Sequence, residues 1–389
     1  DIYFRNKLII PAAVDIHVHF REPGMTHKED FWSGSASAAF GGVSCVFDMP
    51  NTIPQTTNLK EINDKIGLAS KKSYVDFGLY SGITNNNIQD IEALATKCSG
   101  FKIYLGSSTN TLKFDKINLK DALDKISVTK KPVLFHAEDE ALLLKNRKVE
   151  NNLFDHLKNR PPACEVNSIK DILRESQKIN LKAHICHVSS IEAIELLKKR
   201  PNDVTCGITP HHSLLSADKV DCLKTFYKVN PPIRSEFDKE ALFNAAKNGL
   251  IDVIESDHAP HTKEEKDVEF NDAPSGMPCV ETMLPLYLFL AKKEVISFSK
   301  VISLICEKPA DVLGVTKGRI EIGKEADLIV VDIKEETKIK SDCLHSKCSW
   351  SAFEGWKAIF PTHVFIRGEK VIDGKEIQVR QGFGKFVGE

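Results

Sequence analysis

Six residues that could bind metal ions lie at or near the ends of short apolar stretches of the sequence. They are His17, His19, Lys102, His136, His187 and Asp257. His17 and His19 are two residues apart in a stretch with β-strand character, so both imidazoles point to one face and can bind the same ion. A single histidine at a strand end usually belongs to the core or rim, and a single aspartate can cap a turn. The repetition of such residues, stretch after stretch, predicts a metal site.

The stretches that carry these residues are short and almost continuously apolar, as strands buried on both faces should be. There are eight of them, at residues 13–18, 43–49, 74–83, 100–105, 132–137, 181–188, 203–208 and 251–256. Helix-length amphipathic segments separate most of them. This alternation predicts an α/β fold, a (β/α)8 barrel of the TIM type over residues 13–314. Active sites of such barrels form at the C-terminal strand ends, where the six residues lie.

The last part of the chain has a different pattern. Short runs at 327–332, 363–367 and 370–372 are separated by Gly and Asp turns, which indicates a small antiparallel β unit. The first residues are expected to pair with it. We therefore predict a small β domain formed by residues 1–12 together with residues 315–389. Because the sequence does not begin with Met, we also expect residues to be missing before Asp1.

Composition argues against several classes of protein. The 53 Lys and Arg balance 54 Asp and Glu, whereas nucleic-acid binding depends on clustered positive charge. The longest apolar run, 284–291, is far shorter than the ~20 residues that cross a bilayer. The ten cysteines form no Cys-x-x-Cys pair, and no signal peptide is visible. These features predict a cytoplasmic protein with free thiols and without a nucleic-acid or membrane partner.

Lys102 needs its own explanation among metal ligands. Neighbouring metal ions would repel an ammonium, and burial also disfavours its charge. The neutral amine could add carbon dioxide to give a carbamate, whose two oxygens can bridge two metal ions. Two alternatives stay open: Lys102 could extend its ammonium to water, or His17, His19 and Asp257 could hold a single zinc ion beside an unmodified lysine.

The sequence resembles the dihydroorotases of the amidohydrolase superfamily through motifs that follow in order along nearly the whole chain. The opening motif is Asp-Ile-His-Val-His-Phe-Arg-Glu-Pro-Gly at 15–24, and the most specific one is Ser-Asp-His-Ala-Pro-His-Thr at 256–262. The others lie at 49–52, 101–104, 136–138, 156–162, 187–190, 209–212, 228–232 and 318–328. The motif at 209–212 contains His211 and His212, to which we assign no ligand role.

The resemblance implies reversible hydrolysis of L-dihydroorotate to N-carbamoyl-L-aspartate, a step of pyrimidine biosynthesis. It implies two zinc ions that share a bridging hydroxide and a carboxylated Lys102. It assigns His17, His19 and Asp257 to one ion and His136 and His187 to the other. Asp257 would act as the catalytic base and acid, taking the proton of the hydroxide and giving it to the leaving ring nitrogen.

A second group of residues is expected to bind the substrate. The carboxylate of dihydroorotate matches a guanidinium, and Arg21 projects to the side of His19 if the strand continues. Taken alone, Arg21 would more readily form a salt bridge with Glu22 or Glu29. The resemblance adds four further contacts: Asn51, Asn230, His261 and the backbone of Gly276. The polar segment 107–114 could close over the substrate or could be an ordinary loop.

Other functions fit parts of this pattern. Allantoinases and dihydropyrimidinase-like hydantoinases share the metal ligands, but their substrates lack the carboxylate and they usually lack the counterparts of Arg21 and His261. A non-catalytic scaffold homologue would typically have lost ligands, whereas every ligand position is filled here. A homo-oligomer and an association with aspartate carbamoyltransferase stay open.

Overall fold

The computed structural model describes residues 4–107 and 112–388, and its largest element is a sheet of eight parallel strands. Their order in the sheet is their order in the sequence: β2 (Ala13–Val18), β3 (Val43–Asp48), β4 (Asp76–Gly82), β5 (Gly100–Tyr104), β6 (Val133–His136), β7 (Ala183–Ile185), β8 (Val204–Ile208) and β9 (Val253–Ile254). The two ends of the sheet meet where Val18 forms a parallel bridge with His258. The prediction of a (β/α)8 barrel is confirmed.

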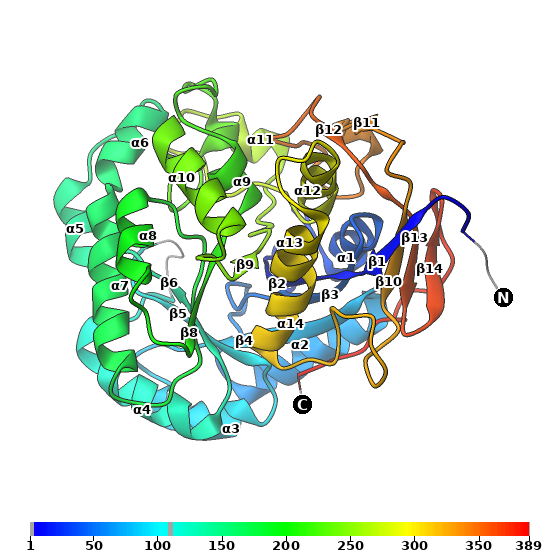
Figure 1. Cartoon of the computed structure of the whole chain (residues 1–389). Coiled ribbons are helices and arrows are strands. Elements are labelled where there is room, and N and C mark those ends of the chain that lie inside the picture. Colours follow the sequence, from blue (N-terminus) through cyan, green and yellow to red (C-terminus); the bar gives the residue numbers. More distant parts are fainter. Residues whose placement is uncertain (1–3, 108–111, 389) are drawn as a thin grey trace.

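Helices cover the outside of this barrel (Figure 1). They are α1 (Phe31–Phe40), α2 (Leu59–Lys72), α3 (Ile91–Ala95), α4 (Leu119–Thr129), α5 (Glu140–Asn146), α6 (Leu153–Asn159), α7 (Pro162–Ser176), α8 (Ile191–Leu197), α9 (Pro210–Leu214), α10 (Glu236–Lys247), α11 (Lys263–Lys266), α12 (Met283–Lys292), α13 (Phe298–Ile302) and α14 (Lys308–Leu313). Several begin at a side chain that accepts a hydrogen bond from the first turn, such as Asp30 before α1 and Ser190 before α8.

Burial on both faces explains why the strand sequences are continuously apolar. One cluster contains Val14, Ile16, Phe47, Leu134 and Val253. Because these side chains come from strands that are not all neighbours in the sheet, the cluster fills the barrel interior. A larger cluster packs the outer faces of the strands against the helices. The barrel is therefore rigid beneath the strand ends.

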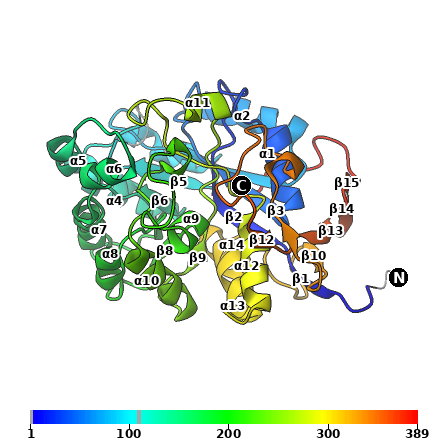
Figure 2. The ribbon, with the colours of Figure 1, turned by 90° about the horizontal axis from the view of Figure 1, so that it is seen from above.

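A small antiparallel sheet lies beside the barrel, near the N-terminus (Figure 2). Its order is β1 (Leu8–Pro11), β10 (Leu328–Val331), β13 (Pro361–Ile366), β14 (Glu369–Asp373) and β15 (Glu376–Ile377). A separate two-stranded ribbon pairs β11 (Thr337–Lys338) with β12 (Lys357–Ala358). The expected pairing of the N-terminal segment with the C-terminal β unit is confirmed by the β1–β10 register.

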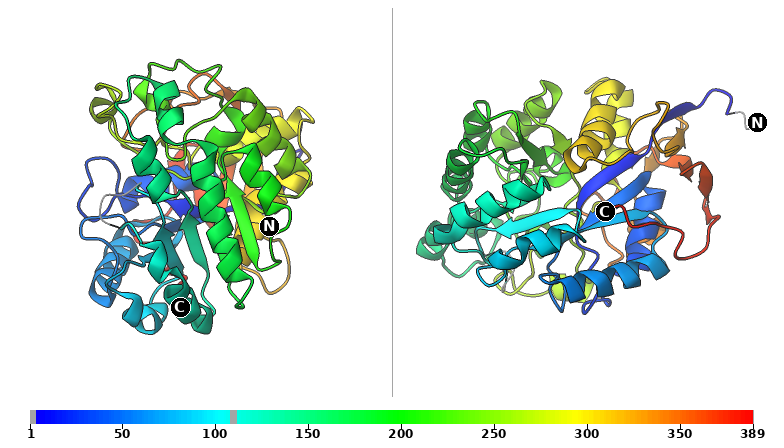
Figure 3. Two further views of the ribbon diagram at one scale, coloured as in Figure 1. Left: turned by 90° about the vertical axis from the view of Figure 1, so that its left-hand side faces the viewer. Right: turned by 90° about the horizontal axis from the view of Figure 1, so that it is seen from below.

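Buried ion pairs join the small sheet to the barrel. Lys317 lies 2.7 Å from both Asp76 of β4 and Asp327, and Arg367 also pairs with Asp76. The last residues return to the barrel, where the Phe77 N–H donates to the carbonyl of Lys385 at 2.9 Å (Figure 3, right). The barrel and the small sheet are thus in direct contact. The boundary predicted between them, with the barrel at residues 13–314, stays a prediction.

None of the described helices has the length and apolar character that a membrane crossing requires. All ten cysteines are unpaired, and most are buried.

Candidate metal centre and ligand pocket

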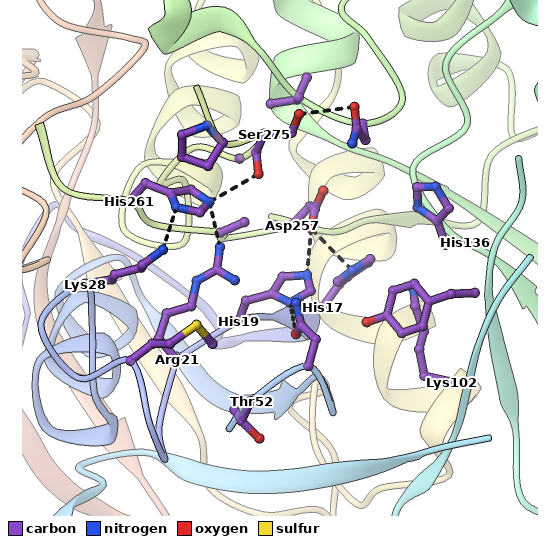
Figure 4. A pocket seen from close by; sticks show the side chains of 18 of the residues that line it. His17, His19, Arg21, Lys28, Thr52, Lys102, His136, Asp257, His261 and Ser275 are labelled. Atoms are coloured by element: carbon purple, nitrogen blue, oxygen red, sulfur yellow. Dashed lines mark hydrogen bonds and ion pairs between the residues drawn. The ribbon is translucent and has the colours of Figure 1, made fainter. Parts of the chain in front are cut away.

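A cavity of about 440 Å³ opens at the C-terminal ends of the barrel strands (Figure 4). All the residues predicted to form the site line it: His17, His19, Arg21, Asn51, Lys102, His136, His187, Asn230, Asp257, His261 and Gly276. The cavity lies at the small end of the range for small-molecule sites. The sequence positions of these residues span most of the barrel, so the fold itself brings them together.

Two of the predicted ligands lie just beyond their strands. His187 and Asp257 have φ values of 40° and 45°, in the left-handed region that costs a non-glycine residue about 1–2 kcal/mol. β7 ends at Ile185 and β9 at Ile254, whereas the apolar runs predicted strand ends at residues 188 and 256. Unusual backbone conformations of this kind are concentrated at functional sites.

The predicted ligand atoms converge in two overlapping groups. Asp257 Oδ1 lies 3.3 Å from His17 Nε2 and 3.1 Å from His19 Nε2. His136 Nδ1 lies 3.1 Å from His187 Nε2. One ligand atom from each of His17, His187 and Asp257 lies within 4.8 Å of the other two. This spacing allows the donors to share one or two cations.

The protonation of the histidines also fits a cation. Burial lowers the pKa of His136 and, more strongly, that of His187, so both imidazoles are neutral at pH 7. The Nε2–H of His136 donates to Glu138 at 2.7 Å, which leaves the lone pair of its Nδ1 facing His187. A metal ion accepts such lone pairs. The donor set present therefore fits a metal centre.

Lys102 is fully buried on β5 beneath the histidines. Its Nζ lies 3.2 Å from Cys186 Sγ and 5.2 Å from the centre of the Tyr104 ring. No ion pair joins it to a carboxylate in the described part of the chain. Burying an ammonium without a counter-charge is costly, so a fully buried lysine without an ion-pair partner is unusual at a strand end.

Two glutamates that the sequence reasoning missed contact the histidines predicted to bind metal. Glu255 Oε2 lies 3.2 Å from the ring Nδ1 of His17, and its Oε1 accepts the backbone N–H of His187 at 2.6 Å. Glu138 plays the same part for His136 and also pairs with Arg160. A carboxylate that accepts the outer N–H of a histidine directs the other ring nitrogen to the metal.

Glu255 is fully buried in the barrel interior, where its neighbours match both its charge and its size. Burial alone would raise its pKa, but His17 and His184 outweigh this effect and hold the pKa well below its usual value. A Cβ atom at Gly207 would lie 2.8 Å from Glu255 Oε1, so only glycine leaves enough room. An acidic residue inside the apolar run 251–256 was the signal that could have revealed it.

Arg21 is 6% exposed and lies beside the metal-ligand groups. Its Nε donates to the carbonyl of Pro260 at 3.1 Å, and its Nη2 lies 3.2 Å from His261 Nε2. Neither Glu22 nor Glu29 pairs with it, because Glu22 pairs with Lys72 and Glu29 accepts from serine hydroxyls. Among residues 4–107 and 112–388, no carboxylate forms an ion pair with this guanidinium, although the charges of Asp257, Asp48 and Glu265 act on it from further away.

Two other residues predicted to contact the substrate, Asn51 and Asn230, form hydrogen-bond contacts with residues of the same cavity. Asn51 Oδ1 lies 2.6 Å from His19 Nδ1 and so orients that imidazole. Asn230 accepts a hydrogen bond from Ser275, close to Gly276. Of the polar segment 107–114, for which closure over the substrate and an ordinary loop were both left open, residues 108–111 lie outside the described part of the chain. Ser107, which precedes them, hydrogen-bonds Glu140.

Three histidines left out of the predicted site are buried near it. His258 Nδ1 accepts the N–H of Cys279 at 3.0 Å, and His184 Nδ1 lies 2.8 Å from Thr205 Oγ1. His211 is also buried, and within the described residues neither of its ring nitrogens is hydrogen-bonded.

Comparisons with known proteins agree with this architecture. The sequence profile of the amidohydrolase family matches residues 8–371. The dihydroorotase of Methanosarcina acetivorans is 39% identical, over 98% of this chain and 85% of that protein. The dihydroorotase of Thermoplasma volcanium is 41% identical, over 97% and 87%. Among solved structures, L-hydantoinase (dihydropyrimidinase) from Arthrobacter aurescens has a TM-score of 0.94 at 29% identity, covering 98% of this chain and 89% of that one.

We expect Glu255→Gln to weaken the binding of a divalent metal by about 10- to 100-fold, as is typical when the partner of a metal-binding histidine is removed. The amide preserves the volume of the side chain but cannot accept hydrogen bonds at both of its terminal atoms. Titration of the metal-free protein with Co²⁺, whose visible absorption reports its ligands, measures the affinity.

Glu281→Gln is the matched control. Glu281 is also buried and accepts a hydrogen bond from a histidine, His345, at 2.8 Å, but it is not among the residues that line the cavity. Equal Co²⁺ affinity in the two variants would contradict the role of Glu255.

Proposed function

The chain belongs to the amidohydrolase family, among the dihydroorotases, and on this basis we propose that it catalyses the reversible hydrolysis of L-dihydroorotate to N-carbamoyl-L-aspartate. The observation that carries this assignment is the buried Arg21, which faces the cavity without a carboxylate partner in the described residues. Dihydroorotate brings a carboxylate, and a guanidinium binds that group with two parallel hydrogen bonds.

The proposed cofactor is zinc, with two ions and a carboxylated Lys102 between them. His17, His19 and Asp257 would hold one ion, and His136 and His187 the other. When bound, such ions lower the pKa of a water molecule and polarise the carbonyl under attack. Binding of a single ion beside an unmodified Lys102 is the alternative form of this centre.

Asp257 would move the proton of the reaction. Burial alone would raise its pKa, but His17, His19 and His187 outweigh this effect and keep the carboxyl ionised. The water would first lose one proton to solvent. As the oxygen of the resulting hydroxide attacks the ring amide carbon, Asp257 would take the remaining proton. It would then give that proton to the ring nitrogen as the C–N bond breaks, which yields a carboxylate and a ureido group.

A cyclic-amide hydrolase that acts on an uncharged ring is the competing function. The observation on its side is the similarity to hydantoinase structures. A shared fold and shared metal ligands cannot distinguish the two functions. Arg21 and His261 argue against it, since an uncharged ring would leave the guanidinium buried without a partner. A cytoplasmic location, a homo-oligomer and an association with aspartate carbamoyltransferase stay predictions.

The zinc-loaded protein should hydrolyse L-dihydroorotate and should act poorly on dihydrouracil and allantoin, which lack the carboxylate. Arg21→Ala should raise KM for dihydroorotate by about 100-fold, the loss expected for two charge-assisted hydrogen bonds. Initial rates on the three substrates measure both effects. The control is Arg319→Ala, which removes an exposed pair with Asp311. Preference for an uncharged ring would overturn the proposed substrate.

Asp257→Asn should lower kcat by about 10³-fold, because an amide cannot accept the proton during attack. Some metal should stay bound, since the histidine ligands are intact. Turnover and metal content, measured on the same sample, separate the two effects. Near-normal turnover would rule out proton transfer by Asp257.

Lys102→Ala should reduce the zinc content from about two ions per chain to about one, because the bridging group is lost. Added propionate, a small carboxylic acid, should restore part of the second ion and of the activity. Metal analysis after removal of loosely bound zinc measures the stoichiometry. Retention of two ions without propionate would refute the bridge.

A further inference from the structure

His261 lies at the side of the cavity, where each of its ring nitrogens faces different groups (Figure 4). Nδ1 lies 3.2 Å from the Nζ of Lys28. Nε2 lies 3.2 Å from both the Nη2 of Arg21 and the carbonyl oxygen of Ser275. Lys28 also lines the cavity and pairs with Glu265 at 3.1 Å. The imidazole is thus held between two cationic side chains.

The imidazole of His261 carries a single proton. Burial lowers its pKa, and the nearby charges of Arg21 and Lys28 lower it further, to about 3 in spite of Glu265. At neutral pH the ring therefore has one N–H and one lone pair. The question is which nitrogen carries the proton, because that decides which neighbour can donate to the ring.

If Nδ1 carried the proton, its N–H would face the ammonium of Lys28. Among the described residues, the carboxylate paired with Nδ1 is that of Glu265. Its Oε2 lies 3.6 Å away, beyond hydrogen-bond distance, and already accepts the Thr262 N–H. Arg21 could then donate to Nε2, but the carbonyl of Ser275 would face a lone pair. This tautomer makes one good hydrogen bond and two repulsive contacts.

If Nε2 carries the proton, two of the three contacts become hydrogen bonds and one, between two donors, is repulsive. Lys28 donates to the lone pair of Nδ1, and the Nε2–H donates to the carbonyl of Ser275. Nη2 of Arg21 then faces an N–H and makes no hydrogen bond with the ring. The guanidinium keeps that donor, and it remains buried beside the cavity without a carboxylate partner in the residues described.

We propose that Lys28 is a positioning residue that holds His261 in the Nε2–H tautomer and thereby keeps the Nη2 donor of Arg21 available for the ligand carboxylate. The role toward the carboxylate rests on the proposed function. Without Lys28, the proton can move to Nδ1 and approach Glu265, and the Nε2 lone pair then captures Nη2 of Arg21. Lys28 therefore acts on specificity through His261.

The tautomer can be measured directly by two-bond ¹H–¹⁵N correlation NMR, in which protonated and unprotonated ring nitrogens have clearly different ¹⁵N shifts. The His261→Gln variant identifies the resonances of His261. We expect an Nε2–H ring in the wild type, an Nδ1–H ring in Lys28→Met, and return to Nε2–H in Lys28→Arg, which keeps a cationic donor. The same tautomer in the wild type and Lys28→Met would overturn the proposal, as would an Nδ1–H ring in the wild type.

Kinetics give a second test. Lys28→Met should raise KM for dihydroorotate by about tenfold with little change in kcat, and Lys28→Arg should recover most of it. The slow rate on dihydrouracil should not change, because that ring has no carboxylate. The matched control is Lys308→Met. Lys308 also pairs with an aspartate, Asp252, but that residue precedes β9 and so lies at the opposite end of the barrel.

The two proposals can fail separately. The NMR measurement needs no substrate, so a wild-type enzyme that does not turn over dihydroorotate would reject the proposed function and leave the tautomer result to decide on Lys28. An unchanged KM in Lys28→Met, in an enzyme that does turn over dihydroorotate, would reject the role of Lys28 in carboxylate binding.

Discussion

The structure depends on where a few buried imidazoles carry their protons. A metal can bind only a ring nitrogen that has a free lone pair. A partner on the far side of the ring therefore has to take the proton. The pairs are His17 with Glu255, His19 with Asn51 and His136 with Glu138. At His261 the arrangement is the opposite: the proposed partner is a donor, Lys28, which donates to Nδ1 and so directs the N–H of Nε2 to the carbonyl of Ser275.

The barrel meets this requirement because parallel strands end at one rim. Side chains from β2, β5 and β6 reach the cavity directly, while His187 and Asp257 do so from left-handed turns just past β7 and β9. The closely packed interior beneath them leaves little freedom for the rings to reorient. Glu255 contributes to both halves of the centre, since it contacts the His17 ring and the backbone of His187.

The predicted metal centre and the proposed carboxylate site would serve different purposes. The fold and the proposed ligands are compatible with hydrolysis of several cyclic amides, which agrees with the similarity to hydantoinases as well as dihydroorotases. Selection would come from the other wall of the cavity, where the guanidinium of Arg21 lies beside the neutral His261 and forms no ion pair with a carboxylate of the described residues. A carboxylate gains most in such a place, because a buried cation without a partner is otherwise costly.

The sequence alone was sufficient to predict the eight strands, the small β unit and many of the residues that line the cavity, although not Lys28. Strand periodicity is local, and the rim position of strand ends follows from parallel topology. The sequence was not sufficient to predict the partners of the histidines. It also did not show that Arg21 lacks an ion pair, because Glu22 pairs with Lys72 and Glu29 accepts from Ser346 instead. Glu255 lies 238 positions from His17, and Lys28 lies 233 from His261. Such pairs exist only once the barrel has closed, so only the tertiary structure decides which nitrogen carries each proton.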